Sequence, residues 1–134
     1  MPESLNRSAV LIGAVSCLVV AVPAVVVTSV LADDGSTDQS NWVFLALLAI
    51  VAAYLLGGAQ AGARALDAPF LNGAAAGFAA FAVVQTVGVV LRLARGDDIS
   101  LIGIVFNGLL AASIGTVGAW FGARRAARST TPLS

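Results

Sequence analysis

The sequence predicts an all-α membrane protein with four transmembrane helices, arranged as two antiparallel hairpins. The chain of 134 residues is 59% hydrophobic and only 10% charged, which is too apolar for an ordinary soluble domain. Its apolar residues fall into four segments that can each cross the ~30 Å hydrocarbon core of a bilayer, and the charged residues lie between them. We expect a single domain over residues 1–134, with spans at about 9–31, 42–64, 69–91 and 100–121.

The first span is uncharged from Ala9 to Leu31. A signal peptide would carry a shorter apolar region, of about 7–15 residues, so we expect a helix that stays in the membrane. Pro23 removes one backbone hydrogen bond, a defect that packed membrane helices tolerate as a kink. The polar stretch 32–41 contains three aspartates and is expected to form an exposed loop, which lacks the glycine and glutamate of a calcium-binding loop.

The second span begins at Trp42, a residue type suited to the membrane interface, and ends at Arg64. A turn at 65–68 leads into the third span. Asp67 is expected to cap this helix, and Pro69 suits its first turn. So short a turn makes the two helices antiparallel neighbours.

The arginines predict the orientation. The side that carries the N-terminus holds five: Arg7, Arg64, Arg124, Arg125 and Arg128. The other side holds Arg92 and Arg95, next to Asp97 and Asp98. Because positive charge accumulates on the cytoplasmic side, we expect both termini to be cytoplasmic. The composition, without lysine, is typical of a bacterial protein of the cytoplasmic (inner) membrane, and the arginine cluster at 123–128 can also attract anionic headgroups.

A shift of sixty residues suggests an internal two-helix repeat. It matches Gly58 with Gly118, Gly62 with Gly122, Arg64 with Arg124, and Gly13 with Gly73. Two hairpins of the same orientation would be parallel repeats related by an axis along the membrane normal.

Paired glycines are the candidate helix-packing residues. Glycines four residues apart let two helix backbones approach closely, which matters in lipid because apolar burial gives little gain there. The candidates are Gly58, Gly62, Gly73, Gly77, Gly115, Gly118 and Gly122. The first span has only Gly13 with Cys17, so we expect it to pack less tightly than the other three. Either these faces pack helices within one chain, or at least one of them binds a second copy or a partner.

Polar side chains at membrane depth are the other candidates, because each needs a hydrogen-bond partner there. Helix geometry places Gln60 and Asn72 near the inner face, and Gln85 and Asn107 in the outer half. Each pair can form an interhelical hydrogen bond. The alternative is a solute or ion path lined by Gln85, Asn107 and Thr86.

The sequence argues against several activities. No charged residue falls inside a predicted span, so a proton-coupled exchanger or a voltage sensor has no group to use. The chain has no histidine and one cysteine, and its carboxylates are outside the spans. We therefore expect no enzyme, no metal site and no cofactor. The zero net charge argues against nucleic acid as a partner.

The segment GGAQAGARALDAPFLNGAAAGFAAF resembles the glycine-rich region between the second and third helices of small four-span bacterial proteins of the YrzE-like type, whose function is unknown. The similarity lies in chain length, span count and the paired glycines on either side of a basic turn. Asn72 stands where that family pattern suggests a histidine. The resemblance implies the fold and no activity.

These observations favour a non-enzymatic integral membrane protein that assembles through its glycine faces, with itself or as an accessory subunit of a membrane complex. The alternative is an oligomeric channel or uncoupled small-solute transporter lined by Gln85, Thr86 and Asn107. On the first hypothesis, Gly118→Ile should reduce the oligomer size in detergent.

Overall fold

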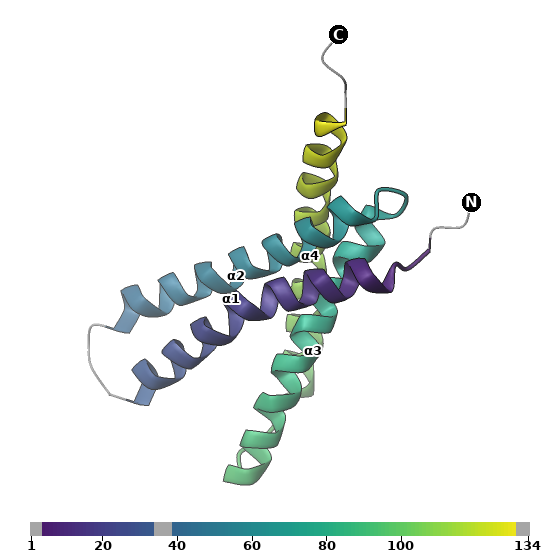
Figure 1. The fold of residues 1–134 in the computed structure, drawn as a ribbon. Coiled ribbons are helices and arrows are strands. Elements are labelled where there is room, and N and C mark those ends of the chain that lie inside the picture. Colours follow the sequence, from purple (N-terminus) through teal and green to yellow (C-terminus); the bar gives the residue numbers. More distant parts are fainter. Residues whose placement is uncertain (1–3, 34–38, 131–134) are drawn as a thin grey trace.

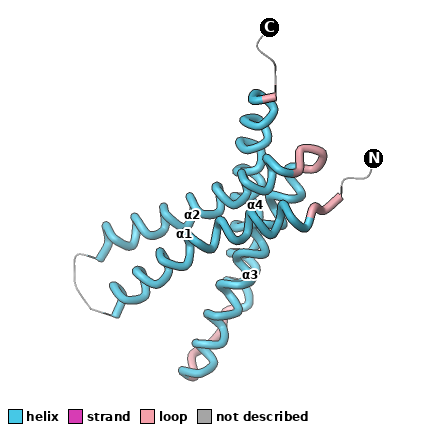
Figure 2. Tube along the Cα trace, in the orientation of Figure 1, coloured by secondary structure: helices cyan, strands magenta, loops and turns pink. Residues whose placement is uncertain are grey.

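The computed structural model describes residues 4–33 and 39–130, and it is entirely helical apart from the connecting turns (Figures 1 and 2). The helices are α1 (Arg7–Asp33), α2 (Gln39–Arg64), α3 (Pro69–Arg95) and α4 (Leu101–Ser129). All four are long and apolar enough to cross a membrane, which indicates a multi-pass membrane protein. The middle of the predicted acidic loop, residues 34–38, lies outside the described residues.

The helices extend beyond the predicted spans because polar ends continue the apolar segments without a helix breaker. Pro23 lies inside α1, as expected. The largest extension is at α4, which continues as a helix through the arginine cluster to Ser129. Positive charge at this end is favourable because a helix C-terminus carries a partial negative charge.

The prediction that Asp67 caps α3 is wrong. The capping position is occupied by Ala68, which makes no side-chain hydrogen bond there. Pro69 at the first helical position needs no amide partner, so a cap is less necessary. α4 does have a side-chain cap, in which Ser100 Oγ accepts a hydrogen bond of 3.2 Å from the Gly103 amide. Gly96 ends α3 at φ 76°, a left-handed conformation that favours glycine.

The helices lie in two side-by-side pairs, α1 with α2 and α3 with α4 (Figure 1). The pairs meet near the start of α1, the turn at 65–68 and the C-terminal half of α4, and they diverge away from that region. α2 contacts all three other helices, whereas α1 and α4 do not contact each other in the described ranges.

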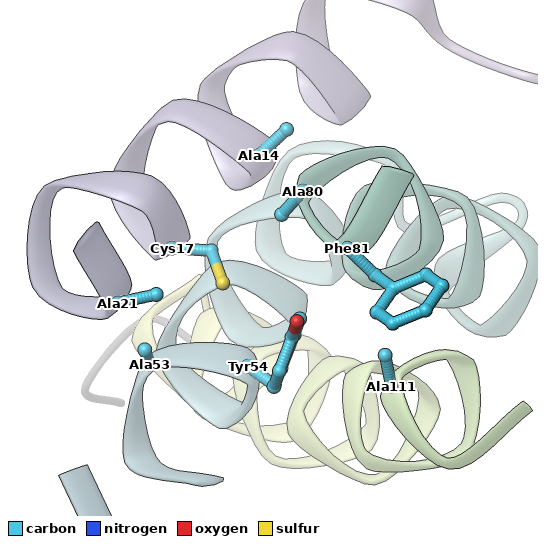
Figure 3. Packing of buried hydrophobic residues seen from close by; sticks show 8 residues of the cluster. All are labelled: Ala14, Cys17, Ala21, Ala53, Tyr54, Ala80, Phe81 and Ala111. Atoms are coloured by element: carbon cyan, nitrogen blue, oxygen red, sulfur yellow. The ribbon is translucent and has the colours of Figure 1, made fainter. Parts of the chain in front are cut away.

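The expectation that the first span packs most loosely is wrong. Ala14, Cys17 and Ala21 of α1 are buried in the main apolar cluster. Figure 3 shows Cys17 and Tyr54, from α1 and α2, directed toward the middle of this cluster. α1 packs closely against α2 because Gly13 and the small side chain of Cys17 face Gly57 of α2.

Candidate functional site

The closest helix contact joins α2 and α4 along glycine-rich faces. A Cβ atom placed on Gly58 would lie 2.7 Å from the carbonyl carbon of Gly115. A Cβ atom on Gly62 would lie 2.6 Å from the Cα of Ala119. Real Cβ atoms almost never come within 3.0 Å of such atoms, so only glycine permits this separation of the two backbones.

The α2–α4 contact is symmetric in sequence. Gly118 faces Leu55, with a Cβ-to-carbonyl-carbon separation of 2.9 Å, and Gly122 faces Ala59 at 2.7 Å. Gly58 of α2 contacts Gly115 of α4, and Gly118 of α4 contacts Leu55 of α2. Positions 58 and 118 differ by sixty, and so do positions 55 and 115, so the sixty-residue shift makes the two contacts equivalent. The two helices therefore present equivalent positions to each other.

Gly115 also contacts α3 and so lies where three helices meet. A Cβ atom on Gly73 would lie 2.7 Å from the Gly115 carbonyl oxygen, and a Cβ atom on Gly77 would lie 2.5 Å from that of Ala111. All seven predicted packing glycines are thus buried against another helix of the same chain.

One close contact was missed by sequence reasoning. Gly13 of α1 and Gly57 of α2 face each other, and Cβ atoms on them would lie 2.5 Å and 2.6 Å from the opposite carbonyl oxygens. A search for glycines four residues apart finds neither, because each helix contributes a single glycine here. The small residues around them, Cys17 and Ala61, were the available signal.

Asn72 is completely buried, but its partner is not Gln60. Its side-chain oxygen accepts a hydrogen bond of 2.7 Å from the backbone amide of Asn6. Its side-chain nitrogen donates to the backbone carbonyls of Ala68 at 2.9 Å and Ser4 at 3.3 Å. Asn72 therefore fixes the residues before α1 against the start of α3. The predicted Gln60–Asn72 bond is wrong: Gln60 is exposed and its side chain accepts a hydrogen bond from Arg64.

Gln85 and Asn107 lie on neighbouring helices, within about one helical turn of each other along the helix axis. Gly77 lies closest to Ala111 and next to Gly115, so eight residues further along the antiparallel helices Gln85 is level with a position between Gly103 and Asn107. Gln85 is half-buried and Asn107 is exposed, and no hydrogen bond joins them. Thr86 is also exposed, and its hydroxyl donates to the Ala82 carbonyl at 2.7 Å.

The chemistry available to these residues is packing and hydrogen bonding. Within the described part of the chain, no three His, Cys, Asp or Glu side chains come together as a metal site would require. Each buried side-chain nitrogen or oxygen in that part has a hydrogen-bond partner.

No protein-family model, curated protein or solved structure matches the chain. The resemblance to the YrzE-like type remains a prediction. Four apolar helices and glycine-mediated contacts are the structural basis for any functional proposal.

Proposed function

We propose that the protein inserts into the cytoplasmic membrane as two parallel two-helix repeats, with both termini on the cytoplasmic side. The symmetric α2–α4 contact supports the repeat, since each helix presents equivalent residues to the other. The distribution of arginines supports the orientation. The turn at 65–68 joins α2 to α3, and the hydrogen bond between Asn72 and the Asn6 backbone joins the start of α3 to the residues before α1.

We further propose that the protein has no catalytic activity and acts by association with a second copy or another membrane protein. The glycine faces are occupied within the chain, so the association must use a different surface. Gly118→Ile would collide with Leu55 of the same chain, and its effect on oligomer size would not identify an interface. A candidate surface is the outer half of the α3–α4 pair, where exposed apolar residues surround Asn107.

The observation that carries this proposal is the exposed side chain of Asn107. It lies six residues into α4, about 9 Å along the helix axis, in an apolar surface that includes Val105, Phe106 and Leu109. Its side-chain amide has no hydrogen-bond partner among the described residues. An amide in hydrocarbon without a partner is costly, and a polar group from a neighbouring chain would remove that cost.

Asn107→Leu tests the association. We expect the variant to shift from oligomer to monomer in mild detergent, measured by light scattering after size-exclusion chromatography. Gln60→Leu is the matched control, because Gln60 is an exposed amide already bonded to Arg64. An unchanged oligomer in Asn107→Leu, or monomeric wild-type protein, would refute this interface.

An oligomeric channel or uncoupled transporter is the second candidate, because Gln85 and Asn107 place two side-chain amides within about one helical turn of each other. In that case the same residues, with Thr86, would line a path between copies. Solute or ion flux through proteoliposomes that contain the oligomer separates the two candidates. Flux that Asn107→Leu abolishes supports the path, and a tight oligomer without flux supports association alone.

A further inference from the structure

The C-terminal third of α4 carries an arginine stripe, which we define as Trp120, Phe121, Arg124, Arg125 and Arg128. Trp120, Arg124 and Arg128 are four residues apart, as are Phe121 and Arg125, so the two rows follow one side of the helix. In the same stretch Gly118, Ala119 and Gly122 are buried against α2 and α3. The arginine stripe therefore faces away from the rest of the protein, toward its surroundings.

The aromatic residues of the stripe form a shallow hollow with the arginines. The Arg124 guanidinium carbon lies 4.1 Å from the centre of the Trp120 ring, in a cation–π contact. The rings of Trp120 and Phe121 meet edge to face at 4.8 Å. The five side chains line an open hollow of about 420 Å³, and the cation–π contact holds one guanidinium at its edge.

The guanidinium groups of the stripe have no acidic partner among the described residues. In residues 4–33 and 39–130 no carboxylate forms an ion pair with Arg124, Arg125 or Arg128, and all three are exposed. Arg64, by comparison, donates hydrogen bonds to the Gln60 carbonyl and side chain. Three exposed guanidinium groups around one hollow, with no ion pair in the described ranges, favour a ligand with net negative charge. Their fork geometry suits the oxygens of a phosphate group.

The position of the stripe on α4 suits the headgroup layer. Tryptophan prefers the interface, and Arg124 and Arg125 lie about 6 to 8 Å further along the helix from Trp120. The negative partial charge of a helix C-terminus is confined to the last turn. Because α4 continues to Ser129, Arg124 and Arg125 precede that turn.

We propose that the arginine stripe binds the phosphodiester group of an anionic phospholipid, with Arg124 and Arg125 contacting the phosphate and Phe121 contacting the upper acyl chain. The proposal rests on the proposed insertion in a membrane. Free phosphate offers the same oxygens but has no acyl chain for Phe121. A zwitterionic lipid brings its own cation beside the phosphate and gains less from three unpaired arginines.

Quenching of Trp120 fluorescence by brominated lipids tests this site directly. Trp42 is first replaced by Phe, so that Trp120 is the single tryptophan, and the full chain is reconstituted in phosphatidylcholine vesicles. Brominated phosphatidylglycerol is then titrated against brominated phosphatidylcholine. We expect selective quenching by the anionic lipid, and a loss of about fivefold in selectivity for each arginine removed, so that R124Q/R125Q loses more than about tenfold.

The control variant is R92Q/R95Q, which removes two exposed arginines at the end of α3, next to Asp97 and Asp98. Preserved selectivity in this variant, with its loss in R124Q/R125Q, supports the site. An equal loss in both variants would mean that only overall charge matters, and it would overturn the proposal. So would competition by inorganic phosphate at millimolar concentration without lipid selectivity.

The same titration separates this proposal from membrane insertion. Equal quenching of Trp120 by both lipids would place α4 in the bilayer but overturn the phosphate site. Absence of quenching by either lipid would overturn both.

Discussion

The missing side chain of glycine decides how closely these helices approach. Gly118 lies against the backbone of Leu55, and a Cβ atom on Gly118 would be 2.9 Å from the Leu55 carbonyl carbon. A neighbouring backbone cannot move aside as the end of a flexible side chain can. Gly88, in the C-terminal half of α3, has no atom within 4 Å of the corresponding position. The same residue type therefore has opposite consequences at the two sites.

Gly118→Ala and Gly88→Ala make a matched pair of variants. Alanine is favoured over glycine in a helix by up to ~1 kcal/mol, so Gly88→Ala should leave stability unchanged or raise it. At Gly118 the overpacking cost of about 1–3 kcal/mol should exceed that gain, and the variant should be destabilised. Reversible unfolding by SDS in mixed micelles, followed by circular dichroism, gives both values. Equal stabilisation by the two substitutions would show that α2 and α4 are further apart than described.

Asn72 is the other residue whose surroundings are decisive. Its side chain satisfies the Asn6 amide and two carbonyls while completely buried. Gln60 on the preceding helix was expected as its partner, because both lie near the same end of the molecule. The expectation failed because the residues before α1 lie over the start of α3. Nothing in the composition of those few polar residues indicates this.

At the scale of elements, α2 and α4 are the equivalent pair. Positions 55, 58, 59 and 62 of α2 face positions 115, 118, 119 and 122 of α4, and the α4 set equals the α2 set plus sixty. Glycine occupies corresponding places in both sets at 58 and 118, and at 62 and 122. A substitution at one position should therefore resemble the substitution at its equivalent.

Gly58→Ala and Gly118→Ala should destabilise the protein by similar amounts, within roughly 0.5 kcal/mol of each other. The double variant should cost less than the two single effects added together, because either methyl group alone separates the same two backbones. SDS unfolding of the three variants measures this coupling. Strict additivity would instead show that the two glycines act at independent sites.

Much of the element-level structure was predictable from the sequence, since each apolar segment is long and ends at a charged or turn-forming residue. The turn at 65–68 is an example, because Arg64 and Pro69 delimit it. The role of α1 was not predictable in this way. Spacing within one helix identifies a glycine pair, whereas the contact of Gly13 with Gly57 depends on which residues of two helices meet. The divergence of the two helix pairs likewise depends on where the helix faces with small residues lie.

At the scale of the whole molecule, the arginines and the helix pairing must agree on one orientation. The start of α1 and the C-terminal part of α4 lie toward the same region as the turn at 65–68 (Figure 1). Five arginines belong to that side, whereas Arg92 and Arg95 at the other end stand close to Asp97 and Asp98. Because the positive-inside bias counts basic residues near the ends of the spans, the five-arginine side should be cytoplasmic.

Cysteine labelling checks this orientation in a Cys17→Ala background, where alanine keeps the Cβ atom that contacts Gly57. Single cysteines at the exposed positions Ser4, Ser129 and Asp98 then report on the two sides. We expect a membrane-impermeant maleimide to label Asp98→Cys in intact bacterial cells, and Ser4→Cys and Ser129→Cys only in inverted vesicles. Labelling of Ser4→Cys and Ser129→Cys from opposite sides would require an odd number of crossings. Such a result would contradict the four-span arrangement, because four crossings return both termini to the same side of the membrane.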